Sequence, residues 1–163
     1  MTRLPLILIL PLLTLSACKL SVTRNNSPLI DNLDGVWTYP KEQPGDTSVT
    51  VIKGMRYRIF DYYEDTGYEL SRSGEVWGQE GVYFCPNEAS YYSPKFFVEK
   101  NDQRFLILNK NDYDKYIREG RLEVSVLIRV ADELDEGKPP IRLSIEVLGL
   151  PYDNPFDSAN WSE

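Results

Sequence analysis

Two cysteines are the residues of this chain whose chemistry stands out first, and histidine is missing altogether. The chain has 163 residues; Cys18 and Cys85 are its cysteines, and it contains no histidine. Without histidine the chain cannot by itself form a Ser-His-Asp triad, a Cys-His pair or an HExxH zinc site. A thiol can still act as a nucleophile or accept a covalent modification. The surroundings of each cysteine therefore decide what chemistry is open to it.

Cys18 ends an apolar leader that has the features of a signal peptide. Residues 1–3 give a short basic start, and residues 4–15 (LPLILILPLLTL) are almost wholly apolar. This stretch is too short for a membrane-spanning helix, which needs ~20 apolar residues. An ordinary secretory peptidase requires a small residue three positions before the cut, where Leu15 is too large. The four residues Leu15-Ser16-Ala17-Cys18 instead resemble the lipobox of bacterial lipoproteins, Leu-(Ala/Ser)-(Gly/Ala)-Cys.

This resemblance implies a lipid anchor on Cys18. In that family the leader is cut between the residues that correspond here to Ala17 and Cys18. The cysteine carries a diacylglyceryl thioether, and its freed amine is acylated, for example with palmitate. Each buried methylene contributes ~0.8 kcal/mol, so two or three acyl chains hold a protein firmly in a membrane. Lys19 in place of an aspartate favours the outer membrane in a Gram-negative host, and otherwise the cell membrane. The alternative is an uncleaved or conventionally cleaved leader with a chance cysteine.

The other reactive or aromatic residues have structural interpretations beside functional ones. Once Cys18 is modified, Cys85 has no partner for an intrachain disulfide. We expect a small buried side chain there, with a dimer disulfide or a reactive thiol as alternatives. Aromatic residues are concentrated between positions 57 and 97, where core and cross-strand packing would account for them. They could also line a cavity or rim that contacts a ligand or partner. The candidates for such contacts are Tyr62, Tyr63, Tyr91 and Tyr92.

Acidic residues gather in three places, at 61–65, at 112–114 and at 132–137. None has the ligand order of an EF-hand loop, so we expect a solvated turn, a helix cap and a solvated charged loop. Paired carboxylates could hydrolyse glycosidic bonds without histidine, but no pair stands out. The sequence therefore predicts no catalytic residue, no metal site and no cofactor apart from the lipid on Cys18.

The elements that must hold these residues are mostly strands. Asn101-Asp102 predicts a tight turn, and residues 113–119 predict one short helix, with Asn111-Asp112 as its cap and Gly120 as its end. Short β-rich runs at this spacing predict a mainly β fold, an antiparallel barrel or sandwich. The predicted strands are 47–53, 55–63, 68–78, 80–86, 95–100, 104–110, 121–131 and 141–149, the last two paired with each other.

These elements divide the chain into four parts. We expect a signal peptide at 1–17, a lipidated cysteine and flexible tether at 18–32, a β domain at 33–150 and a surface extension at 151–163. A tether of fourteen residues spans roughly 20 Å on average, which lifts the domain clear of the lipid headgroups.

A Gly-x-Trp motif at Gly35-Val36-Trp37 resembles the first strand of lipocalin-like proteins. Residues 73–86 (SGEVWGQEGVYFCP) resemble the central hairpin of small lipocalin-like lipoproteins. The resemblance implies a β-barrel in which an arginine from a late strand, here Arg129, packs on Trp37. We expect Trp37 and Trp77 in the core. Another antiparallel β fold is the alternative.

Charge excludes some partners. Lys and Arg total 18 against 25 for Asp and Glu, a net charge of −7. Such a chain is a poor ligand for nucleic acid or for an anionic lipid surface, because both need clustered positive charge. We expect a lipid-anchored envelope protein whose β domain binds a small apolar ligand or an envelope component without catalysis. A protein–protein adaptor or inhibitor at the membrane surface is the alternative, and a carboxylate-dependent hydrolase is a third.

Overall fold

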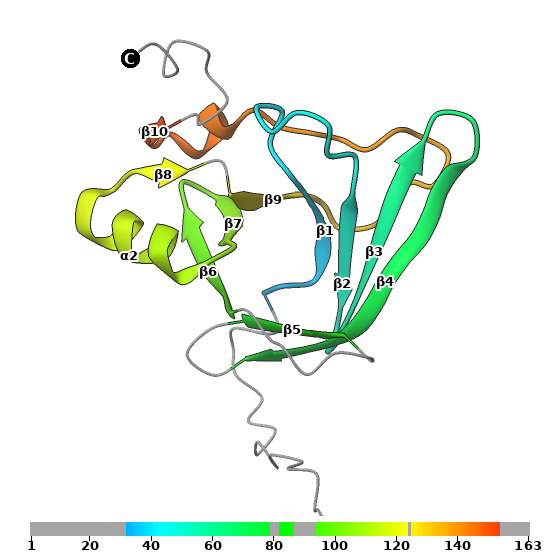
Figure 1. Cartoon of the computed structure of the whole chain (residues 1–163), viewed down its shortest axis with the longest axis horizontal. Helices are drawn as coiled ribbons and strands as arrows, with labels where there is room; N and C mark the ends of the chain where they lie inside the picture. The colour runs from blue at the N-terminus through cyan, green and yellow to red at the C-terminus, as the bar shows by residue number, and fades with distance from the viewer. Residues whose placement is uncertain (1–31, 79–81, 87–93, 124, 154–163) are drawn as a thin grey trace, which may run out of the picture.

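The computed structural model describes residues 32–78, 82–86, 94–123 and 125–153, and it shows a closed antiparallel barrel (Figure 1). Each barrel strand pairs with its neighbours in barrel order, which closes where β9 returns to β1. The mainly β prediction is confirmed, and the closed order decides for a barrel and against a sandwich. The strands are β1 (Gly35–Thr38), β2 (Val49–Lys53), β3 (Arg56–Tyr63), β4 (Gly67–Gly78), β5 (Val82–Pro86), β6 (Pro94–Lys100), β7 (Gln103–Ile107) and β9 (Val126–Ala131).

Tight turns join the strands where the sequence predicts them. Asn101 and Asp102 have φ angles of 52° and 59° between β6 and β7. Positive φ at both central residues is what a two-residue type I′ hairpin turn requires. Glu64 and Asp65 lie exposed in the β3–β4 turn, whereas Asp61 belongs to β3 and accepts a hydrogen bond from the Ser48 hydroxyl at 2.9 Å. These contacts agree with the structural interpretation of the first acidic group.

The barrel interior is filled with apolar side chains. Trp37 is fully buried, and its indole N–H donates to the carbonyl of Leu33 at 2.8 Å. Tyr57 stacks on Phe84, with ring centroids 4.8 Å apart. The predicted core position of Trp37 is confirmed. The most buried members of this interior core are Leu33, Trp37, Ile52, Tyr57, Val76, Val82, Leu106 and Leu127.

Trp77 does not share this environment. It is half-buried, and its indole N–H donates to the exposed carboxylate of Glu75 at 3.1 Å. Side chains alternate between the two faces of a strand, and Val76 takes the interior position on β4. The prediction that Trp77 is a core residue is therefore wrong.

Gly35 and Arg129 give the Gly-x-Trp motif a structural reason. Arg129 lies opposite Trp37 in the β1–β9 pairing, and its Nε donates to the carbonyl of Asp34 at 2.8 Å. A Cβ on Gly35 would lie 2.5 Å from that Nε and 2.8 Å from the carbonyl oxygen of Ala131. Gly35 also has a φ of 141°, which favours glycine. The guanidinium of Arg129 therefore passes over a position where no side chain fits.

A second apolar core lies outside the barrel, against β7 and β9. It is covered by α2 (Lys110–Glu119), the 3₁₀ helix η1 (Ile145–Leu148) and the small parallel sheet of β8 (Leu122–Glu123) and β10 (Tyr152–Asp153). On β7, Phe105 and Ile107 belong to this outer core and Leu106 to the interior. Burial on both faces explains why β7 and β9 contain unbroken apolar runs.

Three of the predicted elements differ from the structure in kind or in extent. The strand predicted at 141–149 is wrong, because Ser144 caps η1 and Gly149 ends it with a φ of 61°. The strand predicted at 121–131 is divided into β8 and β9. Helix α2 begins earlier than predicted, with Asn109 as its cap, and ends at Gly120 as predicted.

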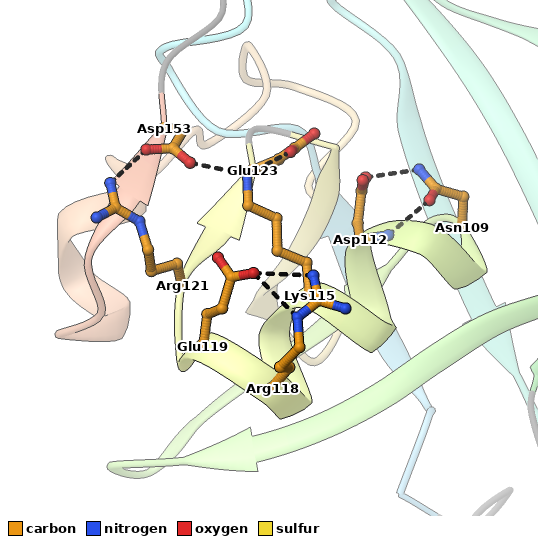
Figure 2. Close-up of polar contacts among 8 residues, drawn as sticks. All are labelled: Asn109, Asp112, Lys115, Arg118, Glu119, Arg121, Glu123 and Asp153. Atoms are coloured by element: carbon orange, nitrogen blue, oxygen red, sulfur yellow. Dashed lines mark hydrogen bonds and ion pairs between the residues drawn. The ribbon is translucent and has the colours of Figure 1, made fainter.

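A polar network fastens β10 to the rest of the outer layer (Figure 2). The ammonium of Lys115 donates to Glu123 at 2.8 Å and to Asp153 at 2.9 Å. Arg121 also pairs with Asp153, and the two cations lower the pKa of that carboxyl. In the same layer Asp112 takes part in the Asn109 cap. The second acidic group thus serves the helix, as its structural interpretation predicts.

Candidate functional site

An apolar hollow lies on the outside of the barrel, beneath the segment that follows β9. We call this segment, residues 132–144, the strap; it runs across the barrel between β9 and η1 (Figure 1). The hollow between the strap and the barrel wall has a volume of about 220 Å³. The charged side chains at its edge come from the strap. Its apolar lining includes Val36, Val49, Ala131, Leu134, Pro140 and Ile141.

The barrel wall under the strap is apolar because β1 is buried on both faces. All four residues of β1 are buried, with Trp37 in the interior core and its neighbours Val36 and Thr38 lining the hollow. The Thr38 hydroxyl donates to the carbonyl of Ile141 at 2.9 Å. This bond satisfies a buried polar group and holds the strap at a fixed distance from the wall.

The end of the strap is anchored to the loop between β1 and β2. The Arg142 guanidinium donates to the carbonyls of Tyr39 (3.3 Å), Pro40 (2.5 Å) and Gln43. The carboxylate of Glu42 accepts from the Ser144 hydroxyl at 2.5 Å and from the Ile145 N–H at 3.0 Å.

Glu42 is held in its charged form by these contacts. Burial acts to raise the pKa of Glu42, but the hydrogen bonds from Ser144 and Ile145 outweigh it and the pKa is lowered. The anchor therefore depends on an ionised carboxylate at the start of η1.

An aromatic cluster on the β3–β4 hairpin adjoins the hollow. Tyr68 lines it, and the Tyr68 hydroxyl donates to the strap carbonyl of Lys138 at 2.9 Å. The Tyr68 ring lies 5.0 Å from that of Tyr62 and 6.4 Å from that of Phe60, measured between centroids. Burial, with the nearby Tyr62 and Asp135, raises the pKa of the Tyr68 phenol.

The structure places two of the predicted contact residues on this hairpin. Tyr62 belongs to the aromatic cluster, and Tyr63 is 47% exposed at the end of β3. The other predicted site residues lie outside the described residues: Tyr91, Tyr92, Ala17, Cys18 and the side chain of Cys85.

The barrel interior offers a different environment from the hollow. The described interior positions are occupied by packed apolar side chains, as given above. Lys95 is half-buried at the edge of this interior and donates to the carbonyl of Leu108 at 3.4 Å, and burial lowers its pKa. The structure therefore favours the outer hollow over the interior as the place where an apolar group could enter.

A second hollow, of about 300 Å³, is polar. Arg104 and Arg129 line it together with Glu99, Asp102 and Gln103. Arg104 Nε lies 3.6 Å from a Glu99 carboxylate oxygen, and Arg129 pairs with Asp132 at 2.5 Å. Each of the two arginines thus has a carboxylate partner. We therefore interpret this polar hollow as a structural feature of the barrel and not as a binding site. Within the described residues no group of three or more His, Cys, Asp or Glu side chains could hold a metal ion.

Sequence reasoning did not find the residues that line the hollow. Val36, Ala131 and Ile141 are ordinary apolar residues from separate segments, and they meet only because the strap crosses β1. One signal was present, the pair Pro139-Pro140, which keeps a chain extended and denies it a regular strand.

Helices in the described part of the chain are all too short or too polar to cross a membrane. Comparison with known proteins finds no matching family model, no matching curated protein and no matching solved structure. The interpretation of this barrel therefore depends on its own residues.

Proposed function

We propose that this chain is a lipid-anchored protein of the bacterial envelope, and that it binds an envelope component by taking a small apolar group beneath the strap, without catalysis. The observation that carries the binding part is the apolar hollow of about 220 Å³ between the strap and β1. The lipobox-like Leu15-Ser16-Ala17-Cys18 supports the anchor, and its position ahead of the barrel supports the envelope as the location.

The size of the hollow limits what can bind. Sites for drug-sized ligands have volumes of roughly 300–1,000 Å³, whereas an apolar cavity of about 150 Å³ accepts benzene. A hollow of about 220 Å³ therefore suits a single ring or a short branched alkyl group. Such a group could be a small apolar ligand, or one side chain or acyl segment of a larger envelope component.

The lipid anchor on Cys18 compensates for the weak affinity of such a small site. Burying ~100 Å² of apolar surface contributes about 2.5 kcal/mol, which alone gives only weak binding. Two molecules held at one membrane meet at a high effective concentration, so weak contacts become sufficient. The lipid on Cys18 and the hollow thus act together in this proposal.

The anchor is tested by the mass of the mature protein extracted from bacterial membranes. We expect a chain that starts at Cys18 and carries acyl chains, and Cys18→Ser should release the protein or leave it as a precursor. A mature chain that begins at an unmodified residue would contradict the anchor.

The binding site is tested by photo-crosslinking in living bacteria. Ile141 lines the hollow and is 56% exposed, so a benzophenone side chain placed there should crosslink to the bound envelope component. Val147 is 41% exposed on η1 and provides the control position. Crosslinks at 141 that are absent at 147 support the proposal; equal crosslinking at both positions, or none at 141, would refute it.

A further inference from the structure

The β3–β4 hairpin extends beyond the barrel and presents a strand edge (Figure 1). Within the described residues, β5 pairs with β4 from Gly78 to Gly74, where the partner is Pro86. Between Gly67 and Ser73, no described strand pairs with β4 on the side away from β3. Edge strands of this kind carry backbone donors and acceptors that another strand can use.

Four consecutive residues of this edge are exposed, namely Glu69, Leu70, Ser71 and Arg72. Leu70 is 58% exposed and gives this edge an apolar surface. Within the described residues Arg72 forms no ion pair, while Glu69 accepts a hydrogen bond from the Thr66 hydroxyl at 2.8 Å. The edge therefore combines an apolar residue with two charges of opposite sign.

A β-bulge places these two charges on one face. Ile59 pairs with Arg72 and Phe60 with Leu70, so Ser71 is an extra residue on β4. Asp61 pairs with Glu69 and lies two residues from Ile59, on the same face of β3. Arg72 and Glu69 therefore share that face as well. In a regular strand, two residues that are three positions apart would lie on opposite faces.

We infer that this edge pairs with the same edge of a second copy of the chain. An antiparallel pair related by a two-fold axis perpendicular to the sheet keeps each residue on its own face. Only residues that share a face can then stand opposite each other, and the bulge gives this property to Glu69 and Arg72. Glu69 of one copy stands opposite Arg72 of the other, twice per dimer, and the two Leu70 side chains flank the axis.

The charge pattern selects a second copy over an unrelated strand. Like charges that stand directly opposite each other on paired strands are destabilising, so an edge with charges of one sign would repel an identical edge. This edge carries one charge of each sign in the order that neutralises its own antiparallel copy. The inference is independent of the hollow beneath the strap, because neither Glu69 nor Arg72 lines that hollow.

Charge reversal with rescue tests the dimer in the full-length lipidated protein, extracted in detergent and studied by sedimentation over a range of concentrations. Glu69→Arg and Arg72→Glu each turn two attractive pairs into two repulsive ones, so each should weaken the dimer about tenfold or more. The double variant Glu69→Arg/Arg72→Glu restores both pairs and should return the dimer to within about threefold of the unmodified chain.

Lys100→Glu is the matched control, because it makes the same charge change as Arg72→Glu at an exposed position on β6. Circular dichroism confirms that each variant keeps its strands. The inference is overturned if the unmodified chain is monomeric throughout, if the single reversals behave like Lys100→Glu, or if the double variant remains as weak as the single ones.

Discussion

Replacing Gly35 by alanine tests the arrangement that closes the barrel. The new Cβ would lie 2.5 Å from Arg129 Nε and 2.8 Å from the backbone oxygen of Ala131. The arginine could move, but the backbone oxygen belongs to the β9 strand that pairs with β1. Crowding of this kind costs ~1–3 kcal/mol, and a residue other than glycine at a φ of 141° adds ~1–3 kcal/mol of backbone strain. We therefore expect Gly35→Ala to lower the free energy of unfolding by about 2–6 kcal/mol.

Gly45→Ala provides the matched control. Gly45 has a φ of 75°, and no atom lies within 4 Å of its added Cβ. This variant has strain without crowding and should cost only ~1–2 kcal/mol. The assay is urea denaturation of the soluble chain from residue 19 onward, followed by tryptophan fluorescence. Equal losses in the two variants would refute the claim that Arg129 and Ala131 exclude a side chain at position 35.

The remaining predictions concern the core and the strap anchor. Trp37→Ala should lower the free energy of unfolding by ~3–5 kcal/mol in the same urea assay, because Trp37 is fully buried. Trp77→Ala should lower it clearly less, because Trp77 is only half-buried. Similar losses in the two variants would contradict the assignment of Trp37 to the core and of Trp77 to the outside. Glu42 has a lowered pKa in the folded chain, so its contribution to stability is present at neutral pH and is lost as the pH falls through the folded value. Urea midpoints measured from pH 7 down to pH 3 should therefore fall less steeply for Glu42→Gln than for the unmodified chain, and identical pH profiles would count against the anchor.

Alternation of apolar and polar residues was sufficient to predict most of the barrel. Asn101-Asp102 and the runs on either side of it predict a hairpin, because few other residues accept positive φ at two successive positions. The same pattern predicts strands wherever one face is buried and the other meets water. It also predicts a strand at 121–131 that contains β9, and glycine as a helix stop predicts the end of α2 at Gly120.

Alternation failed where the outer layer packs on the barrel. Residues 141–149 alternate like a strand, yet Ile145 and Leu148 pack on the outer core from a 3₁₀ helix. Their local caps, Ser144 and Gly149, were present in the sequence but are weak signals beside the apolar pattern. For Trp77, strand alternation indicated a face but could not tell which face was the interior.

The candidate site was largely outside the reach of sequence reasoning. Tyr62 was selected for its residue type, and it lies in the aromatic cluster beside the hollow. The hollow itself is formed by β1, β2, β4, β9 and the strap, which come together only when the barrel closes and the strap crosses it. No local pattern encodes that crossing.

Titration of the methyl-labelled soluble chain with benzene, followed by NMR, tests the central claim most directly. Benzene is small enough for the hollow and has no polar group that could bind elsewhere through hydrogen bonds. We expect the largest shifts at methyl groups that line the hollow, little change at the exposed Ile117 and Val147, and loss of binding in Ala131→Leu, which fills the site. Shifts confined to interior residues such as Ile52 and Leu106, or binding that Ala131→Leu leaves unchanged, would contradict a site beneath the strap. The methyl groups expected to respond are those of Val36, Val49, Val130, Leu134 and Ile141.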